Sequence, residues 1–301
     1  MRVRYIGKGF AMNIGFVGLG IMGQPMAKRL LGAGYSLAVY DKVEGRCQAL
    51  VAEGARQAAD PQEAACDSDV VITMVPDTPD VEEAVFGRHG AAQGLKPGKI
   101  LIDMSTISAG ATVEFARRLG EQGCEMLDAP VTGGEPGAVA GTLSIMVGGE
   151  KGTFEKCLPI FKAMGTTVEY TGTHGNGQKT KLVNQVVGAL NLLAAAEGMR
   201  LVAAAKLDPE TTVRVISAGV ASSWMLTRLG PKMLQGDFSP GFRIRLQQKD
   251  LRLAKEWIAE LGLQAPGADL AYSLFTQALE MGLGEQGNQG LYNIWEKRLA
   301  H

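Results

Sequence analysis

Short apolar runs and longer segments with helical spacing alternate through the first half of the chain. The runs at 13–18 (NIGFVG), 70–75 (VVITMV) and 99–104 (KILIDM) are mostly apolar at successive positions, which is typical of strands buried on both faces of a parallel sheet. We expect further strands at 36–40, 125–128, 144–147 and 166–170. The pattern predicts repeated β-α-β units and therefore a parallel sheet.

The strand pattern stops at the glycines between residues 172 and 177. All later segments have helical spacing, and proline or glycine breaks them near 208–209, 239–241 and 266–267. The sequence therefore predicts an α/β fold with a Rossmann-type N-terminal domain over 12–174 and a second, all-α C-terminal domain over 175–301. Residues 1–11 precede the first strand, and we expect them to form a loose extension.

The helix that opens the second half has one unusual face. Segment 177–205 lacks proline and is apolar around most of its axis, which predicts burial on all sides. At 100° per residue, one face nevertheless gathers Gly177, Lys181, Asn184, Gln185 and Gly188, whereas Lys179 lies on the opposite side. This face suits a small polar ligand. Alternatively, Lys181 extends to solvent near the helix start and the amides only cap or cross-link the chain.

Composition narrows the choice of function. The chain of 301 residues is 46% hydrophobic and 20% charged with a formal net charge of -1, which fits a globular protein and offers no basic surface for nucleic acid or an anionic membrane. The apolar run of the central helix is interrupted by Gly188 and Asn191, and we expect it to be too short to span a bilayer. The first residues lack the apolar core of a secretory signal.

Cysteine and histidine placement excludes two further kinds of site. The four cysteines are far apart, without a C-x-x-C pair or neighbouring histidines, so neither a metal site nor a disulfide framework is indicated; they are Cys47, Cys66, Cys124 and Cys157. Free thiols fit a reducing cytoplasm. We therefore expect a cytoplasmic protein that acts on a small molecule.

A glycine-rich turn follows the first strand directly. Gly18, Gly20 and Gly23 form G-x-G-x-x-G before a helix, with Leu19, Ile21 and Met22 between them, and Asp41 ends the next strand about 20 residues later. This order is that of a dinucleotide site, with the pyrophosphate at the helix N-terminus and the acid on the ribose hydroxyls. Asp41 would repel a 2′-phosphate and favours NAD, whereas the nearby Lys42 and Arg46 leave NADP open.

Other candidate ligand contacts lie at the carboxyl ends of later strands, where such sheets bind ligands. Val75, Pro76 and Thr106 occupy these ends, although they would also serve as plain connectors. Thr132, Gly133 and Gly134 offer consecutive backbone N–H groups and a hydroxyl, which fits a carboxylate nest or, alternatively, a glycine-rich hairpin.

Reduction of a carbonyl with a nicotinamide cofactor requires a proton donor. None of the three histidines is well placed, and only His174, before the hinge, remains a remote candidate. Lys181 is the better donor, because partial desolvation would lower its pKa, and Asn184 and Gln185 would orient it. Helical spacing predicts that Phe242, Leu246 and Lys249 lie on one face of a helix. Lys249 and Asp250 either reach the ligands or form a solvated charge pair on this amphipathic helix.

Four collinear motifs resemble the β-hydroxyacid dehydrogenase family, which includes 3-hydroxyisobutyrate dehydrogenase. They cover nearly the whole chain after Met12 and read GLGIMGQPMA, DAPVTGGEPGAVAGTLSIMVGG, G-x-G-x-x-x-K-x-x-N-Q and F-x-x-x-L-x-x-K-D-L. The resemblance implies an NAD(P)-dependent reductase of a small semialdehyde acid and a homodimer or homotetramer formed by the helical half. The versions GGEP and KLVNQ imply tartronate semialdehyde as substrate, with 3-hydroxyisobutyrate, glyoxylate and succinic semialdehyde chemistry as alternatives.

The resemblance also implies residue roles. Lys181 is the expected general acid/base; the substrate contacts are Thr132, Gly133, Gly134, Asn184, Gln185, Phe242 and Asp250; Thr106 and Lys249 are expected to contact the cofactor. Thr132 departs from the usual serine, and 284–290 (GEQGNQG) lacks the usual aspartate and serine, so substrate choice is open. A non-catalytic dinucleotide-binding module would usually have lost the lysine, which is present here.

Overall fold

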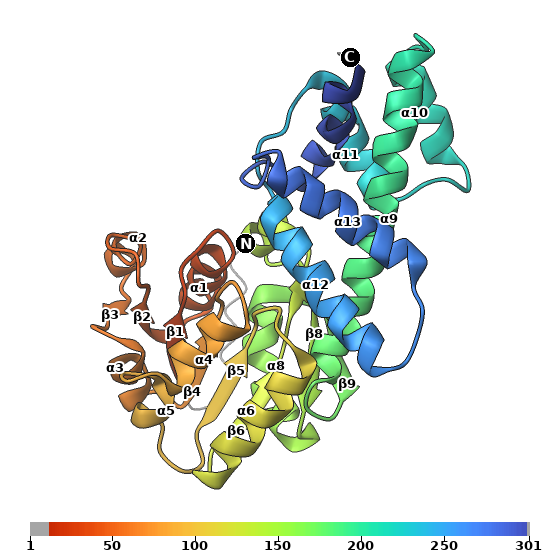
Figure 1. Ribbon diagram of the computed structural model, residues 1–301. Helices are drawn as coiled ribbons and strands as arrows, with labels where there is room; N and C mark the ends of the chain where they lie inside the picture. The colour runs from red at the N-terminus through yellow and green to blue at the C-terminus, as the bar shows by residue number, and fades with distance from the viewer. Residues whose placement is uncertain (1–11, 300–301) are drawn as a thin grey trace. The chain divides into compact units, whose positions relative to one another are not determined.

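The computed structural model describes residues 12–299, so the expected extension at 1–11 lies outside the described residues. The chain divides into two compact units, one up to Gln178 and one from Lys179. Each unit has its own hydrophobic core. The β-α-β and all-helical halves expected from the sequence are both present (Figure 1).

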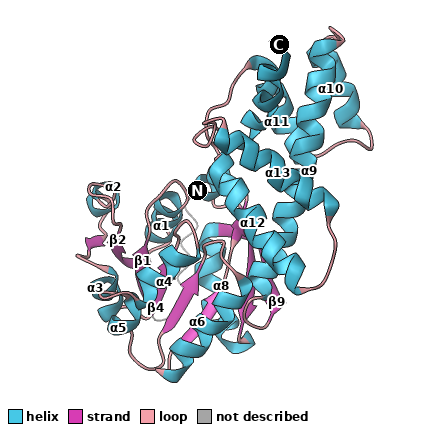
Figure 2. Ribbon diagram, in the orientation of Figure 1, coloured by secondary structure: helices cyan, strands magenta, loops and turns pink. Residues whose placement is uncertain are grey.

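In the part of the first unit that the structure describes, a nine-stranded sheet forms the centre. Its order is β3-β2-β1-β4-β5-β6-β8-β7, with β9 also paired to β8. Figure 2 shows the strands in magenta and the helices in cyan. The strands are β1 (Asn13–Val17), β2 (Ser36–Tyr40), β3 (Arg56–Gln57), β4 (Val70–Thr73), β5 (Ile100–Asp103), β6 (Glu125–Asp128), β7 (Val131–Thr132), β8 (Leu143–Gly149) and β9 (Gly165–Gly172). Strands β1 to β6 are parallel, whereas β8 runs antiparallel to β6 and β7.

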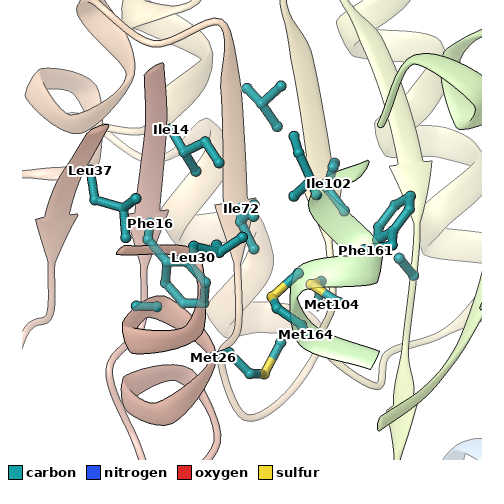
Figure 3. Close-up of a cluster of buried hydrophobic side chains, with 14 of the residues drawn as sticks. Ile14, Phe16, Met26, Leu30, Leu37, Ile72, Ile102, Met104, Phe161 and Met164 are labelled. Atoms are coloured by element: carbon teal, nitrogen blue, oxygen red, sulfur yellow. The ribbon is translucent and has the colours of Figure 1, made fainter. Parts of the chain in front are cut away.

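Helices cover both faces of this sheet because successive strand residues point to opposite sides. On β5, Ile100 and Ile102 join one apolar cluster and Leu101 joins the other. Helices α1, α2, α7 and α8 contribute to the first cluster, part of which is shown in Figure 3, and α3 to α6 contribute to the second. The helices are α1 (Gly23–Gly32), α2 (Gln48–Ala52), α3 (Pro61–Cys66), α4 (Thr78–Phe86), α5 (Ala91–Gly94), α6 (Ala109–Glu121), α7 (Gly134–Ala140) and α8 (Lys151–Met164).

Local signals explain several helix starts. Asp60, Asp77 and Ser108 each accept a hydrogen bond from a first-turn backbone N–H, as N-cap side chains do. Proline stands in the first turn of α3 and α4, where its missing N–H costs nothing. The four cysteines are free thiols, of which Cys66 at the end of α3 is exposed and the other three are buried.

The second unit is helical throughout its described residues. Its elements are α9 (Asn176–Ala204, which begins just before the unit), α10 (Pro209–Ala218), α11 (Trp224–Gln235), α12 (Ile244–Glu260), α13 (Pro266–Glu280) and the 3-10 segment η1 (Asn288–Leu299). One side of α9 packs into the core of this unit through residues such as Ala189, Leu192 and Ala196. The breaks predicted at 208–209 and 266–267 are confirmed as the starts of α10 and α13.

Two expectations about α9 are wrong. The helix is not buried on all sides, because Val183, Val187 and Leu201 on one strip are more than half exposed. It is also long and apolar enough to cross a membrane by length and composition, contrary to the expectation that its apolar run is too short. A single helix that passes this test is weak evidence of a membrane span, because the core helix of a soluble protein passes it too; in α9, 39% of the apolar window is buried.

Candidate active site

The glycine turn after β1 contains two glycines that the fold requires and one at which the fold would accept a side chain. Gly18 has φ +97°, and a Cβ there would lie 2.3 Å from the Met74 carbonyl oxygen; a Cβ on Gly23 would lie 1.9 Å from that of Gly18. A Cβ on Gly20 would meet nothing within 4 Å. The open space at Gly20, beside the N-terminus of α1 with its first-turn N–H groups and no acidic residue, fits a pyrophosphate.

The residues between these glycines differ in exposure. Leu19 is buried, and Ile21 and Met22 are half-buried, with Met22 at the N-cap of α1. The Leu19 N–H donates to Asp41 Oδ2 at 2.6 Å. The turn and the acid expected from the sequence are therefore brought together.

Asp41 follows β2 and holds its own loop. Its Oδ1 accepts from the Val43 N–H at 2.7 Å, and Arg46 Nη1 lies 3.4 Å from both carboxylate oxygens. Lys42 instead pairs with Asp80 at 3.1 Å. Lys42 and Arg46 are the two cations that could favour NADP. Arg46 lies at Asp41, whereas Lys42 pairs with a different carboxylate.

The loops after β4 and β5 are tied to each other. The Val75 N–H donates to Ser105 Oγ at 2.9 Å, and Thr73 Oγ1 donates to Asp103 Oδ1 at 2.8 Å. Because β4 and β5 are parallel neighbours, both loops lie at the carboxyl edge of the sheet. Pro76 is exposed and Val75 and Thr106 are partly exposed, so these three predicted cofactor contacts have accessible surface.

The loop at Thr132 is not a plain hairpin, because α7 separates the antiparallel strands β7 and β8. Gly133 and Gly134 both have positive φ, at +131° and +63°, and Gly134 begins α7. Both glycines are exposed and Thr132 is partly exposed. Backbone N–H groups of such a turn can bind a carboxylate, although Glu135 in the first turn of α7 adds a negative charge nearby.

In the second unit, Lys181 on α9 is buried, with 7% of its surface exposed. Burial lowers the pKa of Lys181 from 10.5 to about 8; the Asp250 carboxylate opposes this shift and the Lys249 ammonium adds to it. The lysine therefore does not extend freely to solvent. With a pKa of about 8, the side chain can give a proton as the ammonium and take one as the neutral amine near neutral pH.

A chain of polar side chains connects α9 to α12. Asn184 Nδ2 donates to Gln185 Oε1 at 2.8 Å, and Gln185 Nε2 donates to Asp250 Oδ2. Lys249 Nζ lies 2.7 Å from Asp250 Oδ1, with the two side chains 12% and 3% exposed. The interpretation of Lys249 and Asp250 as a solvated pair is therefore wrong. The helix α12 turns this pair inward, so both lie near Lys181.

The sequence predicts that Phe242 shares a helix face with Leu246 and Lys249. It lies two residues before α12 begins, so helical spacing does not apply to it, and it is partly buried. The backbone oxygen of Phe242 accepts from the Asn288 N–H at 2.7 Å. This bond ties Phe242 to the segment 284–290 that departs from the family pattern.

One buried residue of the first unit carries contacts that sequence reasoning missed. Asp128, fully buried at the end of β6, accepts from the Gly175 N–H at 2.9 Å and from the Gln178 N–H at 3.0 Å. Burial raises the pKa of Asp128, and these hydrogen bonds oppose the rise. His174 Nε2 is 3.0 Å from the Met126 oxygen, which fits a turn residue. The signal for Asp128 was its place as the first residue of the quoted motif DAPVTGG.

The glycine turn with its acid, the tied strand-end loops and a buried lysine of lowered pKa define a nicotinamide-dependent oxidoreductase. Residues 13–172 match the family described as the NAD binding domain of 6-phosphogluconate dehydrogenase, and residues 175–295 match the NAD-binding family of NADP-dependent 3-hydroxyisobutyrate dehydrogenase. The chain belongs to the 3-hydroxyisobutyrate dehydrogenase-related family of β-hydroxyacid dehydrogenases. Its NAD(P) cofactor follows from both matches.

Individual relatives cover nearly the full length. The chain is 40% identical to an uncharacterized oxidoreductase of Bacillus subtilis (strain 168), covering 95% of this chain and 99% of the relative. It is 39% identical to the 2-hydroxy-3-oxopropionate reductase of Escherichia coli (strain K12), covering 96% and 99%. The crystal structure of 3-hydroxyisobutyrate dehydrogenase from Salmonella typhimurium superposes with a TM-score of 0.87 at 31% identity, covering 94% and 99%.

Proposed function

We propose that the protein reversibly reduces tartronate semialdehyde (2-hydroxy-3-oxopropanoate) to D-glycerate, with NADH as reductant and Lys181 as general acid/base. The observation that carries the proposal is the buried Lys181, whose pKa is lowered to about 8 beside Asp250. The similarity to the E. coli 2-hydroxy-3-oxopropionate reductase supports the choice of substrate.

Lys181 protonates the carbonyl oxygen during reduction and takes the proton back during oxidation. Asp250, held by Gln185, stabilises the protonated lysine. We assign the substrate carboxylate to the turn formed by Thr132, Gly133 and Gly134. Asn184, Gln185 and Phe242 complete the proposed substrate contacts, and the proposed functional domains are 12–174 and 175–301.

The residues of the first unit fit a nicotinamide dinucleotide, because Gly20 leaves room beside the N-terminus of α1. When bound, the cofactor supplies the hydride. Residues Gly18 to Gly23 would hold its pyrophosphate and Asp41 its adenosine ribose, and Val75, Pro76, Thr106 and Lys249 are the remaining proposed contacts. We propose a preference for NADH because the Asp41 carboxylate accepts from the Leu19 N–H of the turn at 2.6 Å and would repel a 2′-phosphate there.

Absorbance at 340 nm tests the proposal with purified protein. NADH and NADPH are each run against tartronate semialdehyde, glyoxylate, succinic semialdehyde and methylmalonate semialdehyde. We expect the highest kcat/KM for tartronate semialdehyde with NADH. A higher kcat/KM for another aldehyde would leave the family assignment unchanged and would contradict the proposed substrate. A higher kcat/KM with NADPH would contradict the role given to Asp41.

The alternative substrates have their own support. The 3-hydroxyisobutyrate dehydrogenase of S. typhimurium shares the fold, and the departures at Thr132 and 284–290 concern substrate choice. Loss of NADH oxidation with every aldehyde would instead favour a non-catalytic dinucleotide-binding module. The retained Lys181, with Asn184 and Gln185 beside it, argues against that module.

We also propose that the protein is a cytoplasmic homodimer or homotetramer, assembled through the second unit. Val187 on α9 is 53% exposed and Trp224 at the start of α11 is 61% exposed, which leaves large apolar side chains in water. Val187→Asp should reduce the molar mass measured by light scattering after size exclusion, since a charge in an apolar interface is unpaired. Val113→Asp, at a 48% exposed valine of α6, is the matched control. A monomeric wild type would contradict this assembly.

A further inference from the structure

Thr106 lies between two buried residues whose backbone groups have a common partner. Ser105 and Ile107 are both 0% exposed, whereas Thr106 is partly exposed at the carboxyl edge of the sheet. The side-chain amide of Gln178 donates from Nε2 to the Ser105 oxygen at 2.9 Å. Its Oε1 accepts from the Ile107 N–H at 3.1 Å. One amide therefore fixes the backbone on both sides of Thr106.

Gln178 is itself held firmly. It is fully buried, and its backbone N–H donates to Asp128 Oδ2 at 3.0 Å. The neighbouring Gly177 has no room for a side chain, because a Cβ there would lie 2.5 Å from the Met146 oxygen and 2.6 Å from the Asp128 oxygen. The first turn of α9 is thus packed directly against the sheet, which leaves the Gln178 amide little freedom.

A second set of bonds reaches the same loop from the sheet. The Ser105 N–H donates to Asp103 Oδ1 at 3.1 Å, and Ser105 Oγ accepts from the Val75 N–H at 2.9 Å. Gln178 thus acts on a loop that is already connected to the neighbouring loop at Val75. Both loops belong to the first unit and carry proposed cofactor contacts.

We propose that Gln178 is a positioning residue for the nicotinamide end of the cofactor, acting through the backbone on either side of Thr106. The inference rests on the contact proposed above between Thr106 and the cofactor. With the adenosine ribose at Asp41 after β2 and the pyrophosphate at the turn after β1, the nicotinamide end falls beyond β4, on the side of β5 and Thr106. The adenosine and pyrophosphate contacts at Asp41 and the glycine turn have no hydrogen bond to Gln178 among the described residues. A change at Gln178 should therefore affect one end of the cofactor more than the other.

Two ligands separate these ends. NAD⁺ carries the nicotinamide, whereas ADP-ribose lacks it and keeps the adenosine and pyrophosphate. Gln178→Met keeps the length of the side chain and removes both hydrogen bonds to the loop. We expect the ratio of the Kd for NAD⁺ to the Kd for ADP-ribose, measured by calorimetry at pH 8, to rise about tenfold, as the loss of roughly one buried hydrogen bond would produce.

Gln178→Glu supplies a rescue test. At pH 8 an ionised carboxylate cannot donate to the Ser105 oxygen, so the ratio should rise as in the methionine variant. A protonated carboxylic acid has one O–H donor and one C=O acceptor and restores both bonds. Burial raises the pKa of such a group, so the ratio should return toward the wild-type value at pH 5.5.

Ser68→Ala is the matched control, because it removes another buried hydrogen bond, from Ser68 Oγ to the Ala64 oxygen at 2.7 Å, next to the opposite end of β4. It should leave the ratio unchanged. Equal weakening of NAD⁺ and ADP-ribose in the Gln178 variants, or an unchanged ratio, would overturn the proposal. Because no aldehyde is present, the result does not depend on the proposed substrate.

Hydrogen exchange of the wild type supplies a measurement that does not require a variant to fold. NAD⁺ should slow exchange in residues 105–108 more than ADP-ribose does, because only NAD⁺ carries the group placed at Thr106. Equal protection by the two ligands would contradict the proposal.

Discussion

Lys181→Ala should lower kcat for carbonyl reduction by at least about a hundredfold, since general acid catalysis contributes factors of this size. The Kd for NADH should change little, because Lys181 is not among the proposed cofactor contacts. Steady-state assays with saturating NADH and fluorescence titration of the cofactor measure the two quantities. Lys179→Ala is the control on the same helix, since Lys179 projects to the opposite side of α9. Comparable turnover in the Lys181 variant would remove this residue from the mechanism.

The pH profile of the wild type tests the same role. The pKa of Lys181 is lowered to about 8 by burial, so the protonated form that reduction needs is present below pH 8 and is lost above it. We expect kcat for reduction to fall above pH 8 and kcat for oxidation to rise through the same range. A profile for reduction that is flat from pH 7 to pH 9.5 would contradict the assignment.

Stability should respond to Lys181 in the opposite direction from activity. A lysine whose folded pKa lies below its unfolded value opposes folding while it is charged, and this cost disappears as pH rises from about 8 toward 10.5. Lys181→Met keeps the apolar stem without the charge. This inactive variant should therefore have a higher Tm than the wild type at pH 7, with the difference shrinking by pH 9.5.

Gly20→Ala should weaken NADH binding by at least about tenfold while leaving the Tm nearly unchanged. The added methyl meets no protein atom within 4 Å, so the fold tolerates it, but it occupies the space beside the N-terminus of α1 where the backbone must approach the pyrophosphate. Fluorescence titration and thermal unfolding of the same sample give both values.

Gly32→Ala is the matched control for Gly20→Ala. Gly32 ends the same helix, and a Cβ there also meets nothing within 4 Å. The control should bind NADH like the wild type and should unfold at the same or a slightly higher temperature, since alanine favours the helix. Unchanged NADH binding in Gly20→Ala would place the pyrophosphate elsewhere.

The parts of the fold that were predicted correctly are those with a local signal in the sequence. Apolar runs of four to six residues gave β1, β4 and β5, and the glycine turn was recognised because strand, glycines, helix and acid follow in order. The two-residue strands β3 and β7 escaped prediction, since Arg56–Gln57 and Val131–Thr132 are too short for a periodic pattern and form only by pairing with longer neighbours.

The parts of the site that the sequence could not predict depend on residues far apart in the chain. Gln178 contacts backbone atoms about 70 positions earlier, and no local pattern announces such a bond. Lys249 and Asp250 look like a solvated pair because helical spacing says which residues share a face and not what covers that face. Gln185, 65 positions before Asp250, provides that cover.

Cys66 offers a way to observe the two units in solution. It is the only exposed thiol among the four cysteines, and it stands at the end of α3 in the first unit. A maleimide dye should therefore label the native protein at one position, without removal of the buried cysteines. A second dye on a cysteine introduced into α10 would then report the separation of the units by energy transfer, before and after ligands are added.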